Sequence, residues 1–118
     1  LLIKDNHVGV AGGVAEAVRA AKDYCSGLDI QVEGDRIGQI EPALAAGADR
    51  LLLDNMKPET LRQAVALVAG RVRLEASGGV NLDTIRGIAE TGVDYVSVGR
   101  ITQSAPAVDI GLDYVLQA

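Results

Sequence analysis

The chain has 118 residues, of which 48% are hydrophobic and 23% charged, which is enough for one domain with one core. Its 14 glycines and 3 tyrosines, with no Phe or Trp, describe an aliphatic core and argue against a protein that stacks nucleic-acid bases on aromatic side chains. The net charge of −5 argues against a polyanion-binding surface, but it leaves room for one cationic pocket that takes a small anion.

Cys25 is the only cysteine in the sequence, so no internal disulfide can form and a reducing, cytoplasmic setting is the default expectation. No apolar run approaches the roughly 20 residues of a membrane span, so we expect no membrane association. No signal peptide is visible, although a start upstream of Leu1 would hide one.

Short apolar runs alternate along the chain with segments of helical spacing. The runs predict strands buried on both faces, at residues 1–3, 30–32, 51–53, 72–74 and 95–98. Apolar residues three or four positions apart predict helices between them, at 14–21, 37–44, 61–68 and 85–89. The order βαβαβαβαβ indicates a parallel sheet in an α/β fold. This alternation of predicted strands and helices ends after residue 104.

A faint internal repeat relates AGADRL at 46–51 to TGVDYV at 91–96. In each copy we expect a helix that stops at a left-handed glycine, Gly47 or Gly92. The chain then turns through Asp49 or Asp94 into the next strand.

Each predicted strand ends in a polar residue or a glycine, namely Lys4, Glu33, Asp54, Ser77 and Gly99. The carboxyl ends of the strands are where a (β/α) barrel builds its active site. Because neighbouring strands lie only about 5 Å apart, these side chains are expected to share one opening. The alternative is an internal network of lysine and carboxylates that only satisfies buried polar groups.

Glu75 lies two residues before Ser77. It is either a further member of this group or a residue that only holds Lys4 or a loop in place. His7 could act as an acid or base, but a single histidine beside Asp5 and Asn6 in a loop is more often a hydrogen-bonded structural residue.

Two glycine-containing loops follow the last two predicted strands, EASGG at 75–79 and SVGR at 97–100. Glycines let backbone N–H groups approach an anion closely, and Asn81 is a plausible cap for a helix that points its positive end at the site. A tight turn is the alternative reading of SGG alone. The predicted phosphate-binding residues are Ser77, Gly78, Gly79, Val98, Gly99 and Arg100.

The motifs together resemble the carboxy-terminal half of the quinolinate phosphoribosyltransferases, from residue 1 to about 113. The resemblance is carried by KDNH at 4–7, QVEGD at 31–35, LLLDN at 51–55, EASGG at 75–79, TGVDYVSVG at 91–99 and ITQS at 101–104. It implies that the chain is part of an open (β/α) barrel of the TIM type. Residues 1–104 would be the carboxy-terminal part of the barrel domain, and 105–118 a terminal segment with a strand that packs on an amino-terminal domain.

The resemblance also implies the reaction, which transfers a phosphoribosyl group from 5-phosphoribosyl-1-pyrophosphate to quinolinate in NAD biosynthesis. Its products are nicotinate mononucleotide, pyrophosphate and CO₂, and Mg²⁺ is the expected cofactor. Lys4 corresponds to the lysine that faces the anionic substrates, and Glu33 and Asp54 to the carboxylates at the ribose and the metal. Much of the family's arginine cluster would lie upstream of Leu1 or on a partner subunit of a homodimer or larger homo-oligomer, so this chain alone is expected to be inactive.

Two positions depart from the family pattern. Gln103 stands where the family often has a histidine, and Gln31 stands where a glutamate is common two residues before Glu33. The alternatives to this function are another phosphate-binding barrel, such as a sugar-phosphate isomerase, and a non-catalytic barrel fragment.

Overall fold

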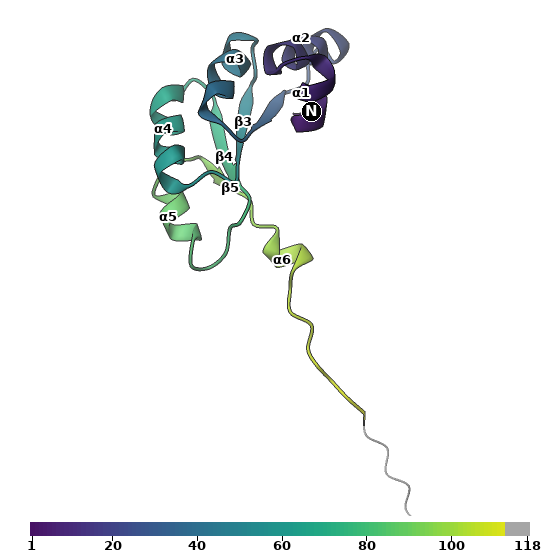
Figure 1. The fold of residues 1–118 in the computed structure, drawn as a ribbon, viewed down its shortest axis with the longest axis vertical. Coiled ribbons are helices and arrows are strands. Elements are labelled where there is room, and N and C mark those ends of the chain that lie inside the picture. Colours follow the sequence, from purple (N-terminus) through teal and green to yellow (C-terminus); the bar gives the residue numbers. More distant parts are fainter. Residues whose placement is uncertain (113–118) are drawn as a thin grey trace, which may run out of the picture.

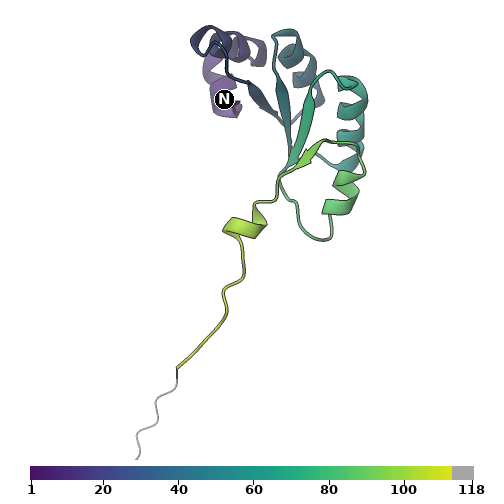
Figure 2. The same cartoon turned by 180° about the vertical axis from the view of Figure 1, so that it is seen from behind.

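The computed structural model describes residues 1–112, and five parallel strands form one curved sheet in it (Figures 1 and 2). Their spatial order, β1-β2-β3-β4-β5, is also their order along the chain. This is the arrangement of consecutive strands in a (β/α) barrel. The strands are β1 (Leu2–Ile3), β2 (Gln31–Gly34), β3 (Arg50–Asp54), β4 (Arg73–Ser77) and β5 (Tyr95–Val96).

The helices follow the strands around the outside of the sheet (Figures 1 and 2). They are α1 (Asp5–Ala11), α2 (Val14–Tyr24), the 3₁₀ turn η1 (Ile37–Gln39), α3 (Ile40–Ala45), α4 (Pro58–Val68), α5 (Ile85–Ala89) and α6 (Arg100–Gln103). Within the described range, no helix is both long and apolar enough to cross a membrane.

The hydrophobic core lies between the sheet and these outer helices. Alternate strand residues such as Val32, Leu51 and Leu74 are buried there, while Glu33 and Glu75 on the inner face are only half-buried. The prediction that each strand is buried on both faces is therefore wrong for the described residues, because five strands do not close around the inner face. The inner face of the sheet is the polar one.

The strands begin and end within three residues of their predicted positions, but the sequence did not predict helix α1. The segment after β1 was expected to be a loop, and His7 was placed in it. Instead, His7 lies in α1 and its Nδ1 accepts a hydrogen bond of 2.9 Å from the backbone N–H of Lys4, which precedes the helix. Gly12, with φ of 86°, ends α1 before α2 begins. His7 therefore caps a helix and fixes the backbone of Lys4.

The internal repeat has the backbone conformation that was predicted for it. Gly47 and Gly92, with φ of 93° and 95°, follow α3 and α5 in the left-handed region that side chains disfavour. Each glycine therefore turns the chain from an outer helix back toward the sheet.

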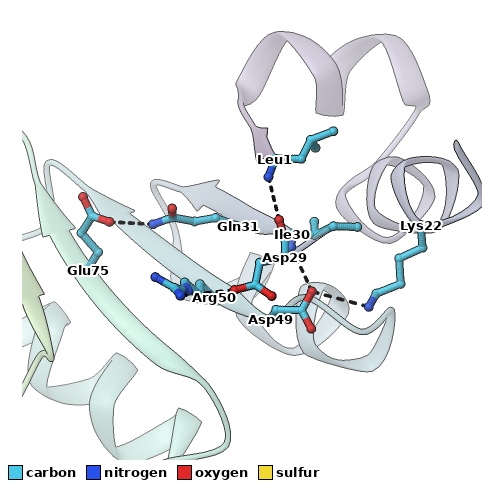
Figure 3. A network of polar contacts seen from close by, with 8 residues as sticks. All are labelled: Leu1, Lys22, Asp29, Ile30, Gln31, Asp49, Arg50 and Glu75. Atoms are coloured by element: carbon cyan, nitrogen blue, oxygen red, sulfur yellow. Dashed lines mark hydrogen bonds and ion pairs between the residues drawn. The ribbon is translucent and has the colours of Figure 1, made fainter. Parts of the chain in front are cut away.

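The aspartates of the repeat each bind the backbone of a neighbouring strand. The carboxylate of Asp49 accepts a 2.9 Å hydrogen bond from Ile30 N–H, and its own N–H donates to the Ile30 carbonyl at 2.8 Å (Figure 3). Asp94 makes the same two bonds with Leu74, at 2.8 and 2.9 Å. Both aspartates thus fix the amino ends of strands, at the edge of the sheet opposite the candidate site.

Residues 104–112 have no helix or strand and extend away from the sheet (Figures 1 and 2). The predicted strand in the terminal segment 105–118 therefore stays a prediction, and residues 113–118 lie outside the described part of the chain.

Candidate active site

The polar residues predicted at the strand ends lie along one edge of the sheet, called the carboxyl edge below. Lys4 follows β1, Glu33 lies in β2, and Asp54 and Ser77 are the last residues of β3 and β4. Asp54 and Ser77 are paired in the strand register, and Glu33 is paired with Leu52, two residues before Asp54. Because all the strands are parallel, the four side chains belong to one edge.

Lys4 and Glu33 form an ion pair across β1 and β2, with 3.5 Å between Nζ and Oε2. The Lys4 side chain is 54% exposed, whereas that of Glu33 is 18% exposed. A buried structural network would enclose its ammonium group. The exposed lysine is instead accessible to a negatively charged solute.

Asp54 has one carboxylate oxygen occupied, because Asn55 Nδ2 donates a 2.6 Å hydrogen bond to Oδ2. Among the described residues, its Oδ1 has no hydrogen-bond partner and the carboxylate forms no ion pair. Asp54 can therefore offer an oxygen to a substrate or a metal ion.

Asn55, in the loop after β3, is hydrogen-bonded to the end of β4. Its backbone N–H donates to the Ser77 carbonyl at 2.9 Å, and its φ of 53° is left-handed. A Cβ on Gly78 would lie 2.3 Å from Asn55 Oδ1 and 2.9 Å from Asn55 N. Only glycine fits there, so the contact explains the first glycine of the SGG sequence and places it beside Asp54.

A pocket of about 360 Å³ joins the two glycine-containing loops, and we call it the anion pocket. Arg100 is the one positively charged side chain among its lining residues in the described chain. The lining consists of Ser77, Gly78, Gly79, Val80, Asn81, Ser97, Gly99, Arg100, Gln103 and Ser104. Of the six predicted phosphate-binding residues, only Val98 lies outside this lining, in the neighbouring depression.

The helix after the SGG loop spans the predicted residues 85–89, but Asn81 does not cap it. α5 starts at Ile85, and Asn81 instead closes a turn before it, with Oδ1 accepting from the N–H groups of Asp83 at 2.9 Å and Thr84 at 3.1 Å. The expected role of Asn81 as the cap of this helix is therefore wrong. The asparagine stabilises the loop, and a five-residue helix adds little dipole at the pocket.

Glu75 lies on the inner face of β4 and contacts neither Lys4 nor another cation in the described chain. Its Oε2 accepts a 2.7 Å hydrogen bond from Gln31 Nε2, shown in Figure 3, and its Oε1 accepts one from the Ser97 hydroxyl. The sequence leaves open whether Glu75 is a further member of the strand-end group or only holds Lys4 or a loop in place, and in the structure Glu75 binds the loop after β5 and not Lys4. The roles of Gln31 and Ser97 in this network had no local signal in the sequence.

A carboxylate with a shifted pKa lies at the opposite edge of the sheet. The hydrogen bond from the Leu74 N–H, and then the one from the Arg73 guanidinium, hold the pKa of Asp94 below its usual range. The Asp94 carboxylate accepts hydrogen bonds from Arg73 and Leu74 of β4 and is not part of the carboxyl edge.

The described residues contain no group of three or more His, Cys, Asp or Glu side chains arranged to hold a metal ion. Glu33 and Asp54 remain as two carboxylates on adjacent strands. This donor set fits Mg²⁺, which proteins often hold through one or two carboxylates together with substrate oxygens.

The family described as "Quinolinate phosphoribosyl transferase, C-terminal domain" matches residues 1–113. The nicotinate-nucleotide pyrophosphorylase [carboxylating] of Homo sapiens is 41% identical over 116 residues, covering 95% of this chain and 39% of its own length. The enzyme of the same name from Mycobacterium leprae is 42% identical over 115 residues, covering 95% of this chain and 40% of its own. The chain thus spans about two fifths of the curated relatives it matches.

Among solved structures, nicotinate-nucleotide pyrophosphorylases are again similar to this chain. The crystal structure of nicotinate-nucleotide pyrophosphorylase from Ehrlichia chaffeensis superimposes with a TM-score of 0.87 at 43% identity, over 96% of this chain and 41% of that one. Thiamine phosphate pyrophosphorylase from Pyrococcus furiosus is more distant, with a TM-score of 0.63 and 27% identity over 69% of this chain and 43% of that one. The fold class that the family resemblance implies, part of a (β/α) barrel with parallel strands alternating with helices, is confirmed by the strand order and by these neighbours.

Proposed function

Because the chain belongs to the quinolinate phosphoribosyl transferase family, we propose that it supplies the carboxyl edge of an enzyme that makes nicotinate mononucleotide. In this reaction quinolinate receives the phosphoribosyl group of 5-phosphoribosyl-1-pyrophosphate, and pyrophosphate and CO₂ are released. The observation that carries the proposal is the presence of Lys4, Glu33 and Asp54 beside an anion pocket on one edge of the sheet.

Lys4 is proposed to bind quinolinate. Its ammonium group is half-exposed and already directed at a carboxylate, that of Glu33. A substrate carboxylate can take a similar position, which gives a charge-assisted hydrogen bond.

Glu33 and Asp54 are proposed to act on the ribose. Breaking the bond between C1 of the ribose and pyrophosphate develops positive charge on the sugar, which nearby carboxylates stabilise. The open Oδ1 of Asp54 suits this role. Decarboxylation then uses the pyridinium ring of the new nucleotide as its electron sink, so it needs no further group from this chain.

The anion pocket is proposed to hold the 5′-phosphate. Ser77, Gly78 and Gly79 offer backbone N–H groups and a hydroxyl, while Gly99 and Arg100 line the facing side. Val98 belongs to the same loop and supports it from the neighbouring depression.

We propose that Glu33 and Asp54 would hold Mg²⁺ together with substrate oxygens, and the bound ion would supply positive charge opposite the leaving pyrophosphate. We propose that arginines outside this chain, upstream or on a partner subunit, bind the same charges. We therefore expect a cytoplasmic homodimer or larger homo-oligomer as the working enzyme.

A sugar-phosphate isomerase or another phosphate-binding barrel would also use the anion pocket. Such an enzyme has little need for Lys4, Glu33 and Asp54 together, so these three residues favour the transferase.

The test uses a hybrid enzyme, in which this chain replaces the matching 41% of the Ehrlichia chaffeensis protein. Formation of nicotinate mononucleotide from the two substrates is measured by chromatography, with the intact Ehrlichia protein as the positive control. We expect turnover by the hybrid enzyme and none by this chain alone. A folded hybrid that binds phosphate but does not bind quinolinate would instead support the other phosphate-binding barrels.

A further inference from the structure

We infer that Glu75 is a positioning residue that holds the anion pocket at a fixed distance from the strand carrying Glu33, an inference that rests on the proposed function. Glu75 uses both carboxylate oxygens, one toward Gln31 on β2 and the other toward Ser97 beyond β5. A single side chain on β4 is thereby bound to β2 and to the loop after β5, across the inner face of the sheet.

The link to β2 is made next to a proposed catalytic group. Gln31 lies two residues before Glu33 on the same strand, so both side chains point to the inner face. The hydrogen bond of 2.7 Å from Gln31 reaches over β3, where Leu52 is the register partner of Glu75. Glu75 therefore ties together two strands that are not neighbours in the sheet.

The link to the loop after β5 is made at the wall of the anion pocket. Ser97 lines that pocket, and its backbone N–H also donates a 2.9 Å hydrogen bond to the Ala76 carbonyl on β4. With its hydroxyl bound to Glu75, Ser97 is held through both main chain and side chain. Ser77 on the other wall belongs to the same strand as Glu75.

The functional consequence follows from the shape of the substrate. A phosphoribosyl group must place its 5′-phosphate in the anion pocket while its C1 lies near Glu33 and Asp54. The separation of these two places decides whether the reacting atoms are aligned, and small errors in such alignment reduce turnover greatly. Both partners of Glu75 are neutral groups, so its role is to accept two hydrogen bonds of fixed direction.

Two substitutions separate positioning from charge. Glu75→Ala removes both links, whereas Glu75→Gln can accept from Gln31 through its oxygen and donate to Ser97 through its nitrogen. In the hybrid enzyme we expect Glu75→Ala to lower kcat about ten- to hundred-fold, with the KM for quinolinate within about two-fold. Glu75→Gln should restore most of the loss. Glu90→Ala, which removes an exposed partner of Arg86 on α5, is the matched control and should change neither constant.

A second measurement needs no substrate. Hydrogen exchange of the Ser97 amide in this chain should become about ten-fold faster in Glu75→Ala, since a bond to a charged acceptor is lost. Gln31→Ala keeps Glu75 but removes the link to β2, and it should lower kcat while leaving Ser97 exchange near the wild-type rate. This variant keeps the test decisive if Glu75→Ala does not fold.

The outcomes distinguish this inference from the proposed function. A hybrid enzyme without turnover refutes the function, while faster Ser97 exchange in Glu75→Ala still supports the link. An active hybrid in which folded Glu75→Ala keeps its kcat refutes the inference alone. Equal losses in Glu75→Gln and Glu75→Ala would also overturn it, because they would make charge the contribution of Glu75.

Discussion

Lys4 Nζ lies 3.5 Å from Glu33 Oε2, where the first two strands of the sheet end. This relationship joins a half-exposed cation to a largely covered carboxylate, and the backbone of Lys4 is itself fixed by His7. The pair therefore presents a positive charge in a defined place, next to the carboxylate that we propose acts on the ribose.

Lys4→Ala in the hybrid enzyme should weaken quinolinate binding by about 1.5–3 kcal/mol, the range for a hydrogen bond to a charged group. Calorimetric titration with quinolinate measures the loss. Lys22→Ala is the matched control, because Lys22 pairs with Asp49 at 3.6 Å on the opposite edge of the sheet. Unchanged quinolinate affinity in Lys4→Ala would remove Lys4 from the site.

Asp54→Asn should reduce kcat far more than the melting temperature, because this strand-end carboxylate is proposed to act on the ribose and is not part of the core. Asp49→Asn should show the opposite, since Asp49 binds the backbone of Ile30 away from the carboxyl edge. Both variants are compared by turnover and thermal unfolding of the hybrid enzyme. A large drop in melting temperature with normal kcat in Asp54→Asn would make Asp54 a structural residue.

Gly78→Ala should destabilise the chain by about 1–3 kcal/mol, the cost of a strained left-handed residue, because φ is 84° and the new Cβ would overlap Asn55. Gly87→Ala is the control, since its Cβ meets nothing within 4 Å and alanine favours the surrounding helix α5. Chemical denaturation of the two variants gives the free energies of unfolding. Equal stability of both would show that the Asn55 contact is not fixed.

Asp94 should make stability depend on pH in acid. Its folded pKa is lowered, first by the Leu74 N–H and then by Arg73, so its charge stabilises the fold above the unfolded value of 3.8. That stabilisation is lost as the pH falls through the lowered pKa. The difference in melting temperature between wild type and Asp94→Asn should therefore stay constant between about pH 5 and 7 and shrink below about pH 3.8. A difference that grows toward acid would contradict this assignment.

Much of the carboxyl edge could be predicted because its signals are local. Four of the five apolar runs are followed directly by their functional candidate, as Asp54 follows 51–53, and parallel strands bring such ends together. The left-handed glycines of the repeat were predictable for the same reason, since Gly47 and Gly92 stand in matching sequences.

The features that were missed depend on distant parts of the chain. Gln31 and Ser97 lie 44 and 22 positions from Glu75, so their hydrogen bonds have no pattern in the sequence. The exposure of the inner face depends on how many strands surround it, which an apolar run does not reveal. Helix α1 was missed because its start relies on the bond between His7 and the backbone of Lys4.

The most direct test of the account follows the carboxyl group that the proposed reaction removes. Quinolinate labelled with ¹³C in its 2-carboxyl group is incubated with 5-phosphoribosyl-1-pyrophosphate, Mg²⁺ and the hybrid enzyme, and labelled CO₂ and nicotinate mononucleotide are quantified by mass spectrometry. We expect one labelled CO₂ for each nucleotide formed, with both products falling together in Asp54→Asn. A folded hybrid that binds phosphate in the anion pocket but forms neither product, while the intact Ehrlichia protein forms both, would contradict it.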